Sequence, residues 1–150
     1  MSFPCCLAAP DCGADSHRER TPPMLTWLLL GLALLYVQTL IPPTMELPRL
    51  GLMGLLGPRD DQDSGVATLR ARRAMWNLLE TLPIFLTLGL VSLILPTEQV
   101  AAGQALLGAQ VYVIARAVFV PIYIVGIPGL RTLAYLAAVA GLVMMTLAIL

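Results

Sequence analysis

The sequence predicts an all-α fold, an integral membrane bundle of four helices. Of its 150 residues, 58% are hydrophobic and 12% are charged, and the mean hydropathy is +0.83. A soluble globular domain carries about twice that share of charged residues. The chain also divides into four long apolar segments separated by Pro and Gly turn signals. The length suits one domain, and the zero net charge gives no indication of a nucleic-acid partner.

Residues 1–23 differ from the rest in being rich in small, polar and Pro residues without a period. We predict a disordered tail, followed by one membrane domain over residues 24–150; Met24 is also a candidate start codon. The tail holds the three cysteines, Cys5, Cys6 and Cys12, whose spacing matches no zinc pattern, so no metal site is predicted. The membrane domain has no thiol of its own. Any thiol chemistry must therefore use a thiol that arrives with a substrate.

The first predicted helix spans residues 24–41, an uncharged run of 18 residues. That length gives about 27 Å of helix, enough to cross a bilayer. We expect Pro42-Pro43 to end this helix. Residues 43–67 then form the longest connection. It could be either a segment that lies at the membrane interface or a flexible loop. The second predicted helix spans about residues 68–95 and stops at Pro96.

The third predicted helix spans about residues 98–127 and the fourth residues 130–150. Tyr112, Arg116, Phe119 and Tyr123 of the third helix recur at a helical spacing that places them on one face. An arginine in the middle of a membrane helix is costly and needs a partner. We expect Glu80 of the second helix to be the counter-charge of Arg116.

Arginines orient the predicted bundle. The connection between the first two helices and the start of the second hold five of them, and Arg131 opens the fourth helix at the same end. By the positive-inside rule, this end is cytoplasmic and both termini are outside. The five are Arg49, Arg59, Arg70, Arg72 and Arg73.

The second helix carries the main candidate site. Arg73, Asn77 and Glu80 follow at i, i+4 and i+7, within roughly 60° of arc on one face. Polar and ionisable groups at membrane depth usually mark a function, which favours a site for a polar ligand. The alternative is a set of interhelical hydrogen bonds that fixes packing. No serine–histidine–acid triad is available, because the one histidine is in the tail.

The pattern Arg73-Ala74-x-x-Asn77-x-x-Glu80-x-x-Pro83 resembles the signature of the MAPEG family, the membrane-associated proteins of eicosanoid and glutathione metabolism. The run Ala115-Arg116-x-x-Phe119-x-x-x-Tyr123 resembles that family's third-helix pattern. Gly57-Pro58-Arg59-Asp60 is similar to the loop of bacterial-type members. This resemblance implies a multi-pass protein of a bacterial inner (plasma) membrane.

The resemblance further implies a homotrimer that binds glutathione as co-substrate near the cytosolic face, between subunits. Its contacts would be Arg73, Asn77, Glu80, Arg116 and Tyr123. Guanidinium groups suit the two carboxylates of glutathione, and a carboxylate suits its ammonium group. The expected activity is conjugation of a lipophilic electrophile or reduction of a lipid hydroperoxide, with membrane lipids around the bundle.

Three positions depart from the family's best-known enzymes. Those enzymes have tyrosines where this chain has Phe119 and Thr81. Their thiolate-stabilising arginine corresponds to Arg131 only if the alignment is shifted by one residue. Arg131 is therefore the catalytic candidate. Two other functions stay open: a non-catalytic relative, and a small four-helix multidrug transporter. The transporter predicts a carboxylate without a paired arginine in the first helix, and residues 24–41 contain no carboxylate.

Overall fold

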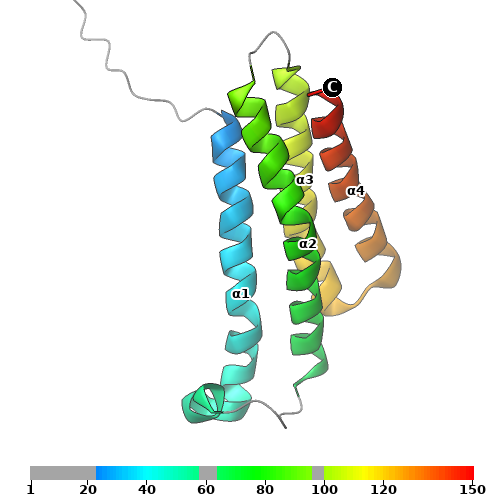
Figure 1. Ribbon diagram of the computed structural model, residues 1–150. Helices are drawn as coiled ribbons and strands as arrows, with labels where there is room; N and C mark the ends of the chain where they lie inside the picture. Colours follow the sequence, from blue (N-terminus) through cyan, green and yellow to red (C-terminus); the bar gives the residue numbers. More distant parts are fainter. Residues whose placement is uncertain (1–22, 58–63, 96–99) are drawn as a thin grey trace, which may run out of the picture.

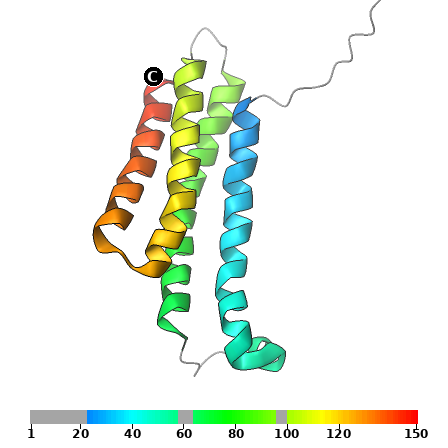
Figure 2. The ribbon, with the colours of Figure 1, turned by 180° about the vertical axis from the view of Figure 1, so that it is seen from behind.

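The computed structural model describes residues 23–57, 64–95 and 100–150. Each of its four helices is long and apolar enough to cross a membrane. They run antiparallel in chain order, as Figures 1 and 2 show. Many large apolar side chains on their outer surfaces are exposed, as lipid contact requires. The protein is thus an all-helical, multi-pass membrane protein. The helices are α1 (Pro23–Leu56), α2 (Val66–Ile94), α3 (Ala102–Val125) and α4 (Pro128–Leu147).

The prediction that Pro42-Pro43 ends the first helix is wrong. Helix α1 continues through Pro42, Pro43 and Pro48 and leaves helical geometry only at Gly51, where φ is 63°. Membrane helices tolerate proline where neighbouring groups hold the chain in place. Here Glu46 of α1 forms an ion pair with Arg72 of α2, with 3.5 Å between the oxygen and the nitrogen. After Gly51 the chain turns across the end of the bundle (Figure 1), so part of the expected connection is helical.

The other helix ends differ less from the predicted ranges. Helix α2 begins two residues earlier than expected, at Val66, and α3 begins at Ala102. Gly126, with φ of 89°, ends α3 in a left-handed conformation, and Pro128 is already in the first turn of α4. Proline is well placed there because the first turn of a helix leaves its N–H groups unpaired. Residues 1–22 of the predicted tail lie outside the described residues. So do Pro58, Arg59 and Asp60 of the predicted turn.

Aromatic and small residues build the core between the helices. The rings of Phe85 on α2 and Tyr112 on α3 are stacked, with centroids 4.4 Å apart, and both are fully buried. Helices α3 and α4 bring their backbones into contact where Gly108 faces Gly141. Small residues at membrane helix contacts let the two backbones come together in this way.

The antiparallel order places the end of α1, the start of α2, the end of α3 and the start of α4 at one end of the bundle (Figure 1). We call this the basic end, because five arginines of the described residues belong to these segments. The opposite end is called the far end. The five are Arg49, Arg70, Arg72, Arg73 and Arg131.

Candidate functional site

A polar cavity of about 380 Å³ opens between α2, α3 and α4 at the basic end. Its volume lies in the range of small-molecule sites. Four of the predicted site residues line it, although they come from three helices. The lining residues are Arg73 and Asn77 of α2, Phe119 and Tyr123 of α3, and Arg131, Thr132 and Tyr135 of α4.

Two arginines, Arg73 and Arg131, face the polar cavity from opposite walls. Both are exposed, and neither guanidinium group forms a hydrogen bond or an ion pair with the described part of the chain. The guanidinium carbon of Arg131 lies 5.6 Å from the centroid of the Tyr123 ring, a cation–π contact that orients it. Both cations are therefore available to a ligand.

Arg116 does not line the polar cavity but lies behind its wall, with 1% of its surface exposed. Its Nη1 donates to Asn77 Oδ1, and its Nη2 donates to Thr81 Oγ1 over 2.6 Å. The expected pairing with Glu80 is not found: within the described ranges the ion pair is that of Arg72 with Glu46. The neutral oxygens of Asn77 and Thr81 are closer because they project toward α3, whereas Glu80 projects outward.

Glu80 is exposed on the outer surface of α2 and does not line the polar cavity. It lies seven residues after Arg73, which is about 10 Å farther along the helix axis. The polar cavity is confined to the basic end and does not extend that far. The two acidic groups of the described membrane helices, Glu46 and Glu80, are thus both absent from its lining.

Two lining residues, Thr132 and Tyr135, were missed in the sequence. Tyr135 follows Arg131 by four residues, so the two side chains lie one turn apart on one face of α4. That spacing was a usable signal. Thr81, noted only as a departure from the family pattern, proves to be a partner of both Arg116 and Tyr112.

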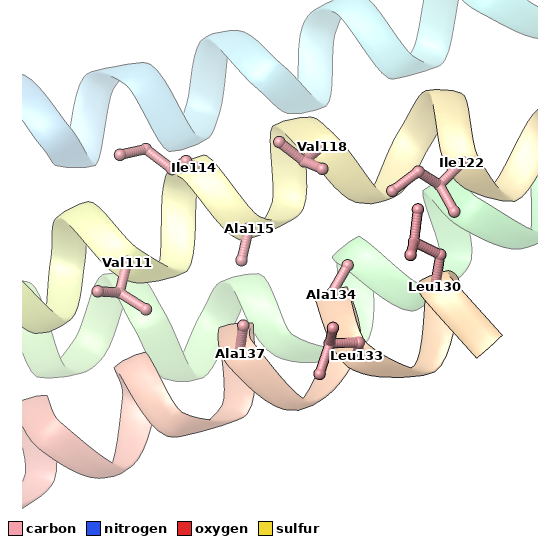
Figure 3. Close-up of a pocket in the computed structure, with 9 residues that line it drawn as sticks. All are labelled: Val111, Ile114, Ala115, Val118, Ile122, Leu130, Leu133, Ala134 and Ala137. Atoms are coloured by element: carbon pink, nitrogen blue, oxygen red, sulfur yellow. The ribbon is translucent and has the colours of Figure 1, made fainter.

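An apolar groove of about 420 Å³ lies on another side of the same two helices, α3 and α4 (Figure 3). Its lining is entirely hydrophobic, and alanines from both helices leave the space. Several of its residues are chain neighbours of those in the polar cavity, such as Ile122 beside Tyr123 and Leu130 beside Arg131. The lining residues are Val111, Ile114, Ala115, Val118, Ile122, Leu130, Leu133, Ala134 and Ala137.

The charges of the polar cavity define what it can bind. Its two guanidinium groups are donors only, while its lining contains no carboxylate. An anionic ligand is therefore favoured, in particular one with carboxylate groups, which guanidinium groups hold bidentately. Within the described ranges no group of three His, Cys, Asp or Glu side chains is placed to hold a metal ion.

No match was found among individually curated proteins. The sequence profile of the MAPEG family matches residues 24–150, which cover all four helices except Pro23, the first residue of α1. The chain belongs to the MAPEG family.

Proposed function

We propose that this protein is a glutathione-dependent transferase or peroxidase that acts on a lipophilic electrophile or a lipid hydroperoxide at the membrane. The observation that carries the proposal is the polar cavity, in which the guanidinium groups of Arg73 and Arg131 form no hydrogen bond or ion pair within the described residues. Family membership supports glutathione as the co-substrate.

The donor groups of the cavity lining fit the carboxylate groups of glutathione. Arg73, at the start of α2, is placed to bind a carboxylate at the membrane boundary. Asn77 and the hydroxyl groups of Tyr123 and Tyr135 can add hydrogen bonds. The fit is incomplete for the ammonium group, because the lining offers no carboxylate.

A homotrimer would supply the missing carboxylate. Glu80 is exposed on α2, so packing of a second copy against this surface would bring it into an interface. We propose that glutathione is bound at such an interface, with Glu80 accepting its ammonium group. A carboxylate facing the membrane without such cover would be costly, which also favours a partner there.

Arg131 is the proposed catalytic residue. A guanidinium group beside a thiol stabilises the thiolate, which is the nucleophile. Stacking on Tyr123 holds Arg131 over the polar cavity. The thiolate then forms a carbon–sulfur bond with an electrophilic carbon while the bond from that carbon to its leaving group breaks and the leaving group departs as an anion. In the alternative reaction, two glutathione molecules are oxidised to the disulfide while a hydroperoxide is reduced to an alcohol and water. The proton of the thiol leaves to water at the basic end.

We propose that the hydrocarbon part of the second substrate lies in the apolar groove. The groove belongs to the same ends of α3 and α4 as the polar cavity, so a molecule there has its polar head close to the catalytic arginine. The small side chains of Ala115, Ala134 and Ala137 make room for a chain (Figure 3).

The transporter alternative depends on a carboxylate in the first helix. Because α1 extends to Leu56, it does contain one, Glu46, contrary to our expectation for a shorter helix. That carboxylate is 3% exposed and paired with Arg72, so it is not a free proton-carrying group. The paired state argues against the transporter. The non-catalytic relative stays open until turnover is measured.

The test is a titration of the detergent-purified protein with glutathione, followed by ultraviolet absorbance of the thiolate at neutral pH. We expect thiolate to form on binding to the wild type. In Arg131→Leu, binding should largely persist, but the thiolate fraction should fall about tenfold or more, since one pKa unit is a factor of ten. Arg49→Leu removes an arginine at the same end that does not line the polar cavity, and should behave as wild type.

Two results would contradict the proposal at different levels. If the wild type binds glutathione without forming thiolate, the protein is a non-catalytic glutathione-binding relative. If the wild type does not bind glutathione, the polar cavity serves another anion.

A further inference from the structure

Asn77 has an amide whose two ends have opposite hydrogen-bonding character. Its oxygen can only accept, and its nitrogen can only donate. Arg116, which lies against this amide, offers donors only, so the oxygen of Asn77 must face Arg116. The NH2 group is consequently turned away from Arg116. Asn77 lines the polar cavity and its nitrogen makes no hydrogen bond with the described part of the chain, so this group is free to face a ligand.

We propose that Arg116 is a positioning residue that sets the polarity of the polar cavity: it holds Asn77 so that the amide presents NH2 to a carboxylate of the ligand. This inference rests on the proposed function for the identity of the ligand, glutathione. Arg116 itself does not touch the ligand. It acts through Asn77.

The surroundings of Arg116 confine it to this role. Three aromatic rings enclose the guanidinium group, with its carbon 5.6 Å from the centroid of Tyr112, 5.7 Å from Phe119 and 5.5 Å from Tyr135. Phe119 and Tyr135 are themselves part of the cavity lining, so they separate Arg116 from a ligand. Its Nε has no hydrogen-bond partner within the described residues, which leaves Nη1 and Nη2 as the groups that fix it.

Thr81 fixes the second arm of the guanidinium group. Its hydroxyl oxygen accepts from Arg116 Nη2 over 2.6 Å and lies 3.0 Å from the Tyr112 hydroxyl. Its one proton goes to the backbone oxygens of Asn77 and Leu78, each 3.3 Å away. Tyr112 must then be the donor to Thr81. Both lone pairs and the proton of this hydroxyl are used, so Thr81 has no capacity left to compete for the Asn77 side chain.

The network therefore turns the donor end of the Asn77 amide toward the polar cavity. The NH2 group of Asn77 adds to the guanidinium groups of Arg73 and Arg131, and all three are donors. Without Arg116, the Asn77 amide could rotate and present its oxygen, which repels a carboxylate. A buried arginine bonded to neutral oxygens thus contributes to carboxylate recognition from outside the polar cavity.

The test is Asn77→Asp, which keeps the size and shape of the side chain. One oxygen can still accept from Arg116, and it now provides that cation with a counter-charge. The other oxygen faces the polar cavity as an anion. We expect a melting temperature equal to or above that of the wild type, together with at least a tenfold loss of glutathione affinity. If Asn77 only ties α2 to α3, the variant should bind glutathione normally, and that result would overturn the proposal.

Thr81→Val is the matched control. It removes one acceptor of Arg116 but leaves Asn77 facing Arg116, so it should lower stability while changing glutathione affinity far less than Asn77→Asp does. Equal losses of affinity in the two variants would show that general loosening, and not polarity, is responsible.

A double-mutant cycle tests the positioning without glutathione. Asn77→Leu, Arg116→Met and the double variant are compared by their unfolding equilibria in detergent. We expect a coupling of about threefold or more in the unfolding constant, as measured for hydrogen bonds inside membrane proteins. Additive effects would overturn the role of Arg116 even if glutathione binds. Failure of the wild type to bind glutathione would instead reject the proposed function, and the coupling would still decide whether Arg116 holds Asn77.

Discussion

Helices α3 and α4 form a pair whose two ends are built in different ways. Toward the far end they run in contact, and toward the basic end they separate before the chain turns, as both ribbon views show. The far end is closed by backbone contact. The basic end is open, and both the polar cavity and the apolar groove lie where the helices part.

The closed end depends on two glycines. A Cβ atom added to Gly141 would lie 2.7 Å from the backbone oxygen of Gly108 and 2.8 Å from the backbone nitrogen of Tyr112. Backbone atoms cannot rotate out of the way as a side chain can. This contact fixes the distance between the two helices toward the far end.

The open end is held by side chains instead. Arg70 of α2 donates from Nη1 to the last carbonyl groups of α3, at 3.3 Å from Ile124 O and 3.2 Å from Val125 O. The two spaces beside it differ because adjacent residues of one helix project in different directions. On α4, Arg131 and Tyr135 line the polar cavity, while Leu130 and Ala134 line the apolar groove. The closed end of this helix pair provides stability, and its open end provides the sites.

Gly141→Ala should have the largest effect, because it tests the closed end directly. Overpacking of a well-packed contact typically costs about 1–3 kcal/mol, and here the neighbours are backbone atoms. Thermal unfolding in detergent should show a clear fall in melting temperature. The matched control is Gly103→Ala on the same helix pair, since a Cβ at Gly103 would meet nothing within 4 Å. A melting temperature equal to that of the control would show that the helices can shift apart without cost.

Much of this arrangement could be predicted from the sequence, because helix formation in a membrane is local and depends on apolar length. The four helices and the helical faces of Arg73 and Asn77 followed from such patterns. The course of α1 past Pro42-Pro43 could not, because the contacts that accompany it, such as the ion pair of Glu46 with Arg72, join residues far apart in the chain.

The prediction of the candidate site was incomplete because it, too, depended on contacts between helices. A helical period gives the direction of a side chain but not the depth at which a cavity ends. The period places Arg73, Asn77 and Glu80 on one face, yet only Arg73 and Asn77 line the polar cavity, and Glu80 is exposed outside it. The role of Thr81 depended on the proximity of Tyr112 and Arg116 on another helix, which no spacing within α2 could show.

Ala134→Leu tests the open end on its apolar side. A leucine at this position would fill part of the apolar groove (Figure 3). A changed fit of one hydrocarbon group in an apolar pocket typically alters substrate affinity about tenfold. We therefore expect KM for long-chain electrophiles to rise by about that factor. Short-chain electrophiles and glutathione should be unaffected, because the polar cavity does not include Ala134. The measurement is the rate as a function of chain length.

Its control is Ala140→Leu, which adds the same bulk at an exposed position of α4 outside the apolar groove. An unchanged dependence on chain length in Ala134→Leu would assign the groove to membrane lipid, and the second substrate would have to bind elsewhere.

Arg70→Leu should have the smallest effect and tests how the open end is held. Its bonds to Ile124 and Val125 carbonyls are partly exposed, so their loss should cost about 1 kcal/mol. A cation at the end of a helix also offsets the helix dipole, and that contribution is lost too. Gly126 follows these carbonyls directly and Pro128 opens α4 two residues later, so a looser end of α3 moves the start of α4 and with it Arg131. We therefore expect a small fall in melting temperature but a several-fold weaker thiolate signal with glutathione, whereas Arg49→Leu should change neither. A full thiolate signal in Arg70→Leu would mean that Tyr123 alone is sufficient to hold Arg131 in place, and that the open end needs no support from α2.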